Sequence, residues 1–134
     1  DLLGSKEYVR NPVVPLEKSI LLNMDGVGIG HSVSAAAGRD FPLIWNFIEE
    51  ANNKYVHRRM NTGSFPNLGR PRLDAAIFLR AGVPSVSFST YGSENYYHIP
   101  QDNPDIIKPE IMEDLAQILF ISVVRMANST GPLR

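Results

Sequence analysis

Apolar side chains recur at helical spacing in two long segments of the chain. Residues 41–55 carry them at positions 41, 44, 45, 48, 51 and 55, which predicts a helix with one buried side. A second helix is predicted over residues 109–128. Its buried side would carry Ile111, Leu115, Ile118, Leu119, Ser122 and Met126. A shorter helix fits residues 74–81, and Asp40 and Asp74 stand where N-caps of the helices at 41 and 74 are expected.

Two further segments have the pattern of strands. Residues 19–23 form a short continuous apolar run, typical of a strand buried on both faces, and a glycine-rich turn follows. Residues 84–89 alternate and predict a second strand. Strands alternating with helices predict an α/β fold, a partial three-layer αβα sandwich with a mainly parallel, truncated central sheet. Two or three strands would leave an unpaired apolar edge, so part of the sheet is expected to be missing.

The composition is that of a globular protein without a strongly charged partner. Of the 134 residues, 43% are hydrophobic and 20% charged, and the formal net charge is -1. This balance gives no reason to expect nucleic acid or an anionic membrane as partner, and Arg58, Arg59, Arg70 and Arg72 are interpreted as solvated surface. The chain has no cysteine, which excludes disulfides, thiolate metal sites and a cysteine nucleophile. No apolar run approaches the ~18–20 residues of a membrane span.

Two candidate metal ligands stand after the predicted strands. Asp25 follows the first strand, and His98 lies in the polar, aromatic loop after the second. In open α/β sheets, ligands collect at the carboxyl ends of strands, so both side chains are expected where a site should be. A carboxylate and an imidazole suit zinc, which takes three protein ligands plus a water, or four protein ligands. The alternatives are a structural Asp-Gly turn for Asp25 and a hydrogen-bonded loop residue for His98.

Five parts of the chain, taken in order, resemble parts of one enzyme family. Residues 2–5 and then 11–16 resemble the segment after the family's Glu-Glu pair, and residues 20–28 resemble the strand that bears its aspartate ligand. Residues 73–84 resemble its Ser-Asp-His helix and Gly-Ile-Pro turn, and residues 97–102 the loop of its last histidine ligand. The chain thus resembles the C-terminal half of the zinc aminopeptidase superfamily, metallopeptidase clan MH. Bacterial aminopeptidases, glutamate carboxypeptidases and glutaminyl cyclases belong to it.

By position, this resemblance implies a site with two zinc ions in the complete parent enzyme. Asp25 would bind one zinc and His98 the other, and such a site activates a bridging water and polarises the substrate carbonyl. Asp102 would orient the metal-bound histidine, as carboxylates commonly do, or would simply cap the loop. Tyr91 and Tyr97 would line the pocket for the peptide substrate, with a surface or core role as the alternative.

The chain departs from the family in the rest of the site. Nothing in it resembles the family's first His-x-Asp motif, and the Glu-Glu pair with the general base would lie just before Asp1. Ala75 stands where the family often has histidine, and His31 and His57 match no ligand position. We therefore expect no catalytic residue within this chain, and weak or absent zinc binding by the chain alone.

Three functions follow as hypotheses. The first is that residues 1–134 are one domain, the C-terminal portion of the catalytic domain of a zinc-dependent aminopeptidase-like hydrolase, inactive alone. The second is a non-catalytic, truncated or degenerate relative whose exposed sheet edge pairs with a second copy or a partner chain. In the parent, the missing N-terminal half is the expected partner at that edge. The third is a glutaminyl cyclase-like acyltransferase that uses one zinc. The compartment stays open, although a secreted or periplasmic location is compatible with the parent.

Overall fold

The computed structural model describes residues 2–65 and 72–133, so Asp1 and Arg70 lie outside the described residues. The α-helices are α1 (Leu3–Arg10), α2 (Pro42–Ala51), α3 (Asp74–Arg80) and α4 (Pro109–Ala127). The strands are β1 (Leu21–Met24), β2 (Val33–Ala36), β3 (Met60–Gly63) and β4 (Ser85–Thr90). The short turns are 3-10 helices η1 (Leu16–Lys18), η3 (Ser93–Tyr96) and η4 (Pro104–Ile106), and a π-helical turn η2 (Asn52–Val56) that extends α2.

The strands of the described chain form one four-stranded sheet in the order β1-β4-β2-β3. β1 runs parallel to β4, with Leu21 beside Ser85 and Met24 beside Phe88. β2 and β3 are also parallel to each other, whereas β2 is antiparallel to β4. The sheet is therefore mainly parallel and open at its edges, as predicted. The expectation of two or three strands is wrong, because β2 and β3 join β1 and β4, the strands that the pattern predicts.

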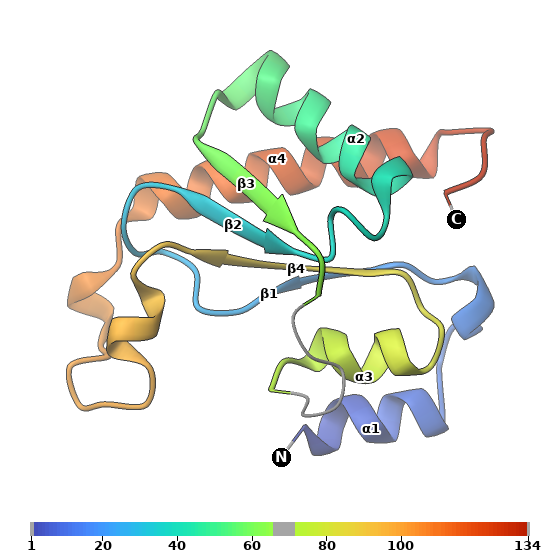
Figure 1. Cartoon of the computed structure of the whole chain (residues 1–134), viewed down its shortest axis with the longest axis horizontal. Coiled ribbons are helices and arrows are strands. Elements are labelled where there is room, and N and C mark those ends of the chain that lie inside the picture. Colours follow the sequence, from blue (N-terminus) through green and yellow to red (C-terminus); the bar gives the residue numbers. More distant parts are fainter. Residues whose placement is uncertain (1, 66–71, 134) are drawn as a thin grey trace.

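Helices cover both faces of the sheet, which gives the predicted three layers (Figure 1). α2 and α4 contact each other on one face, and α1 and α3 contact each other on the opposite face. The main core lies on the α2–α4 side. Its buried members are Val33, Ala35, Val86 and Phe88 from the strands and Ile44, Ile48, Ala51, Leu115, Ile118, Leu119 and Met126 from the helices. The α/β sandwich predicted from the sequence is thus confirmed.

The long helices bury the sides that the apolar pattern predicts. The buried residues of α4 are Ile111, Leu115, Ile118, Leu119, Ser122 and Met126, the same six residues as in the predicted stripe. α2 buries Ile44, Ile48 and Ala51, and η2 continues it to Val56. Full burial of one such aliphatic side chain contributes about 1.5–3 kcal/mol, so these faces account for much of the stability of the layer. No helix of residues 2–65 and 72–133 is long and apolar enough to cross a membrane.

The aspartates predicted as N-caps do not cap their helices. Neither α2 nor α3 has a side-chain hydrogen bond at its N-cap. The Asp40 carboxylate instead accepts a hydrogen bond from the backbone N–H of Phe65 at 2.8 Å. The Asp74 carboxylate accepts one from the Ser5 hydroxyl. Both carboxylates therefore join segments that are distant in the sequence, and the first N–H groups of the helices find no cap in them.

Arg58 ties the segment before β3 to α4, contrary to its interpretation as solvated surface. Its Nε donates to the carboxylate of Asp114 at 2.6 Å, and the side chains of this ion pair are 23% and 26% exposed. The side chain of Asn52 both donates to and accepts from the backbone of Arg58, at 2.8 and 2.9 Å. Arg59 and Arg72 are exposed, as expected.

Candidate functional site

Asp25 lies in a turn that β4 fastens to the end of β1. Its backbone N–H donates to the carbonyl of Phe88 at 2.9 Å, which continues the β1–β4 pairing by one residue. The carbonyl of Gly26 accepts from the backbone N–H of Thr90 at 3.1 Å and from its hydroxyl at 3.3 Å. The same hydroxyl accepts from the backbone N–H of Ile29 at 3.0 Å. Because Thr90 is only 1% exposed, water competes little with these bonds, and the turn is held firmly.

The glycine-rich segment after Asp25 passes close to its neighbours. Gly30 has a φ of +74°, and a Cβ on it would lie 2.0 Å from the carbonyl oxygen of Tyr91. The carbonyl of Gly28 accepts from the backbone N–H of Lys108 at 2.8 Å. The segment is thus fixed between the end of β4 and the start of α4, and glycine is required at residue 30 by both space and conformation.

His98 lies in the loop after β4, close behind η3. Its backbone adopts the left-handed region with a φ of +59°, which is uncommon for a residue other than glycine. The imidazole stacks on the phenol ring of Tyr97, with ring centroids 3.9 Å apart and planes inclined by 17°. The loop then turns back, where the backbone N–H of Asp102 donates to the carbonyl of Ile99 at 3.0 Å. An unusual backbone and a stacked ring together give the imidazole a defined orientation.

Small polar residues form the face of the sheet next to the Asp25 turn. Successive side chains of a strand point to opposite faces, so Ser87 and Ser89 of β4 face away from the main core. In the β2–β4 register, Ser34 lies beside Ser89 and Ala36 beside Ser87. The amide of Asn23 on β1 donates to the hydroxyl of Ser87 at 3.0 Å. Because these side chains are short, they leave room above the sheet.

A cavity of about 880 Å³ occupies this room. Four of the predicted site residues line it, namely Asp25, Tyr97, His98 and Asp102. The floor and far wall include Ser34, Ser87, Ser89, Gly63, Ser64 and Arg72. The structure therefore brings together the turn after β1 and the histidine loop after β4, as the strand-end argument anticipates.

Tyr91, predicted to line the substrate pocket, is not among the residues that line this cavity. Its side chain is 64% exposed, and its ring lies 5.7 Å from the ring of His31. A substrate-binding role for Tyr91 therefore has no support from the lining of the cavity.

The donors in the cavity fit zinc in kind but not in number. Asp25 and His98 offer a carboxylate and an imidazole, which are ordinary zinc ligands. Within residues 2–65 and 72–133, no group of three or more His, Cys, Asp or Glu side chains is placed to hold a metal ion. A zinc site built on Asp25 and His98 therefore needs further ligands from outside the described part of the chain.

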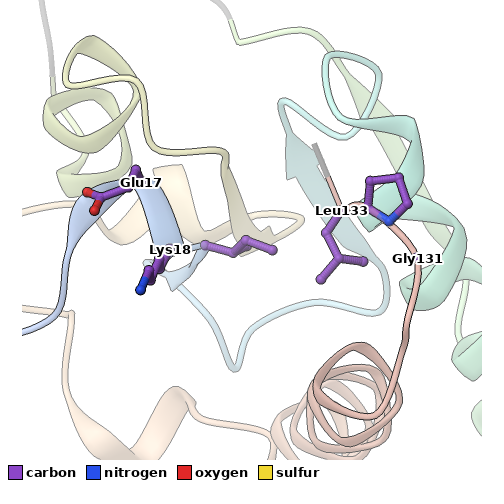
Figure 2. A pocket seen from close by; sticks show the side chains of 6 residues that line it. Glu17, Lys18, Gly131 and Leu133 are labelled. Carbon is purple, nitrogen blue, oxygen red and sulfur yellow. The ribbon is translucent and has the colours of Figure 1, made fainter.

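A second cavity of about 340 Å³ lies where the C-terminal segment meets the segment that leads into β1. Figure 2 shows Glu17 and Lys18 on one side of it and Gly131 and Leu133 on the other. Ile20 and Leu133, which both line it, pack against the main core. Its lining contains one carboxylate and no histidine, so the cavity around Asp25 and His98 is the candidate site.

Comparison with models of protein families identifies a family for this chain. The profile of peptidase family M28 matches residues 1–123 of the 134 residues. The chain belongs to peptidase family M28. The resemblance to zinc aminopeptidases stated from the sequence is thereby confirmed. A comparison with curated protein sequences finds no significant match.

Solved aminopeptidase structures share the fold of this M28 chain. An aminopeptidase from Aneurinibacillus sp. strain AM-1 is 22% identical with a TM-score of 0.71, over 99% of this chain and 32% of that one. BSAP, a zinc aminopeptidase from Bacillus subtilis, is 23% identical with a TM-score of 0.72, over 94% and 32%. The LapA aminopeptidase of Legionella pneumophila is 15% identical with a TM-score of 0.75, over 97% and 37%. The chain thus spans about a third of the length of each structure.

Sequence reasoning missed the floor of the cavity and the guanidinium in its wall. Serines at 85, 87 and 89 alternate with apolar residues, so a polar face on this strand could have been found. Ser34 could not have been placed in the cavity from the sequence, because the pattern of Val33–Ala36 does not predict a strand. Arg72 carries no local signal that separates it from the other surface arginines.

Proposed function

We propose that this M28 chain is the C-terminal portion of a zinc-dependent aminopeptidase-like hydrolase that cleaves N-terminal residues from peptides. The observation that carries the proposal is that Asp25 and His98, which are far apart in the sequence, line one cavity. The family match supports peptide hydrolysis, and the zinc aminopeptidase neighbour supports zinc as the metal. Residues 1–134 are then part of a larger catalytic domain, whose other part supplies the remaining ligands and the general base.

The residues of this chain hold and orient groups at the reacting centre. When bound, two zinc ions supply an activated water and a Lewis acid for the substrate carbonyl. Asp25 would hold one ion from a turn that Thr90 fixes, and His98 would hold the other with its ring stacked on Tyr97. Asp102, in the same cavity, orients the imidazole, as carboxylates near metal-bound histidines do. The serine hydroxyls of the floor are donors and acceptors for the peptide backbone.

The proposal is tested on the longest protein expressed from the gene that carries this chain. Asp25→Asn and His98→Gln are each expected to remove one bound zinc and to lower the rate of hydrolysis of leucyl-p-nitroanilide. The loss should exceed the roughly 10–100-fold that is typical when a residue hydrogen-bonded to a metal ligand is changed. His31→Gln is the matched control, because His31 is exposed and lies outside the lining of the cavity. Full zinc content and full activity in both ligand variants would refute the assignment.

The chain alone is expected to bind zinc weakly and to hydrolyse no peptide, because two ligands make an incomplete site. Calorimetric titration with zinc measures this directly. A dissociation constant below about one micromolar, which corresponds to more than 8 kcal/mol of binding free energy, would contradict the half-site.

Sedimentation and substrate assays separate the other functions. A metal-free dimer that forms as concentration rises would favour the non-catalytic relative, because the sheet ends in open edges at β1 and β3. Cyclisation of glutaminyl peptides without release of N-terminal residues would favour the acyltransferase.

A further inference from the structure

The candidate cavity extends across the whole width of the described sheet. Its lining includes Asp25 after β1, Ser89 of β4, Ser34 of β2 and Gly63 of β3. The order β1-β4-β2-β3 places three strand spacings between the outer two of these strands. At about 4.8 Å per spacing, the cavity floor is roughly 14 Å wide. An extended peptide advances about 3.4 Å per residue, so a segment of up to roughly four residues fits along it.

The charged groups of the cavity come from different parts of the chain. Asp25, His98 and Asp102 follow β1 and β4, whereas Arg72 belongs to the segment before α3. Among the described residues that line the cavity, Arg72 is the one arginine or lysine. It brings a positive charge to a cavity whose candidate metal ligands are supplied by other segments.

The guanidinium of Arg72 is exposed and forms no ion pair with the described residues. Among the described residues there are two ion pairs, which engage Arg58 with Asp114 and Arg125 with Glu50. Arg72 takes part in neither of them, and it is exposed. Arginine binds carboxylates with two parallel hydrogen bonds, which makes it more selective for planar anions than lysine. Because Asp25 and Asp102 also line the cavity, the part of it next to Arg72 is the part suited to a carboxylate.

We propose that Arg72 binds a carboxylate of the substrate and so makes the site selective for acidic peptides. The inference rests on the proposed peptidase function and adds the class of substrate to it. The carboxylate belongs either to an acidic side chain or to the free C-terminus of a short peptide. Both sources fit the width of the floor, and the substrates of the test distinguish them.

The test compares matched substrates on the zinc-loaded protein that carries this chain. Glutamyl- and glutaminyl-p-nitroanilide differ in the side-chain carboxylate, and alanyl-alanine and its C-terminal amide differ in the terminal carboxylate. We expect the acid of at least one pair to have a KM about tenfold to a hundredfold lower, the size typical of hydrogen bonds to a charged group. Arg72→Gln abolishes that difference, and Arg72→Lys keeps part of it. Arg59→Gln is the control, because Arg59 is exposed and outside the lining.

The outcomes separate this inference from the proposed function. Hydrolysis without any preference for the acids overturns the role of Arg72 and leaves the peptidase intact. An equal loss with all four substrates in Arg72→Gln also overturns it, because it indicates a structural role. If no substrate is hydrolysed, the proposed function fails. The arginine Nε–H resonances of the protein are then followed during titration with alanyl-alanine, its amide, N-acetylglutamate and N-acetylglutamine. A shift of the Arg72 resonance with an acid and not with its amide supports carboxylate binding, and equal shifts refute it.

Discussion

Thr90 offers the sharpest test of how the Asp25 turn is held. Thr90→Val keeps the branched shape of the side chain and removes the hydroxyl, which bonds both the carbonyl of Gly26 and the N–H of Ile29. The Gly26 carbonyl keeps the backbone N–H of Thr90 as a partner. The Ile29 N–H loses the acceptor described for it, so the main cost is one unsatisfied donor in a partly buried position.

The magnitude follows from that single donor. Leaving a buried donor unsatisfied costs about 1–3 kcal/mol, and we expect about 2 kcal/mol because Ile29 is partly exposed. Urea unfolding of small proteins has a slope of about 1–3 kcal/mol per molar, so the midpoint is expected to fall by about 1 M. Thr90→Ser keeps the hydroxyl and loses one methyl group, which costs about 0.8 kcal/mol.

The assay combines urea unfolding with hydrogen exchange at the Ile29 amide. Thr90→Val is expected to accelerate exchange of that amide, whereas Thr90→Ser leaves it protected because the acceptor remains. If both variants lose the same stability and Ile29 stays equally protected in both, the hydroxyl does not hold the turn and the reasoning is wrong.

Other contacts give further predictions. Gly30→Ala places a Cβ against a backbone carbonyl at positive φ and is expected to cost more than about 2 kcal/mol in thermal unfolding. Gly4→Ala, with nothing within 4 Å of its added Cβ, is the control, and an equal loss there would contradict the steric argument. Asp114→Asn breaks the pair with Arg58 and should cost about 0.5–1 kcal/mol at low salt and less at high salt; salt-independent loss would argue against an ionic origin. In the longer zinc-binding protein proposed above, Tyr97→Ala should weaken zinc binding by about threefold to tenfold through lost stacking, whereas Tyr97→Phe should not; equal effects would exclude stacking.

The parts of the fold predicted correctly are those in which the buried residues recur at a regular spacing along the local sequence. α4 exposes one side and buries the other over its full length, so its six buried positions recur in the sequence at helical spacing. Even Ser122 fits, because its hydroxyl donates to the carbonyl of Ile118 at 2.7 Å, which satisfies it inside the core. β1 forms where the apolar run predicts a strand, but the expected burial on both faces is wrong. Its residues are partly buried or, at Met24, 55% exposed, because β1 lies at the edge of the described sheet.

The parts that were not predicted depend on distant partners. Met60–Gly63 has one large apolar residue and becomes a strand because β2 lies beside it. Asp40 has the sequence context of a cap, yet its carboxylate bonds to Phe65 beyond β3. Arg72 lines the cavity from a position just before α3, and its neighbours in the sequence do not indicate this role. In these cases contacts with residues distant in the sequence determine the local structure, because tertiary context can override local propensity.

The position of β4 has a consequence for how this protein is made. β4 comes last of the four strands in the chain, yet it lies inside the sheet and joins β1 to the β2–β3 pair. During synthesis from the N-terminus, β2 and β3 can pair early, whereas β1 waits for a partner that emerges much later. The turn with Asp25 depends on Phe88 and Thr90, so the end of the cavity that contains Asp25 is completed late. Until β4 is made, β1 lacks the strand with which it pairs in the described sheet.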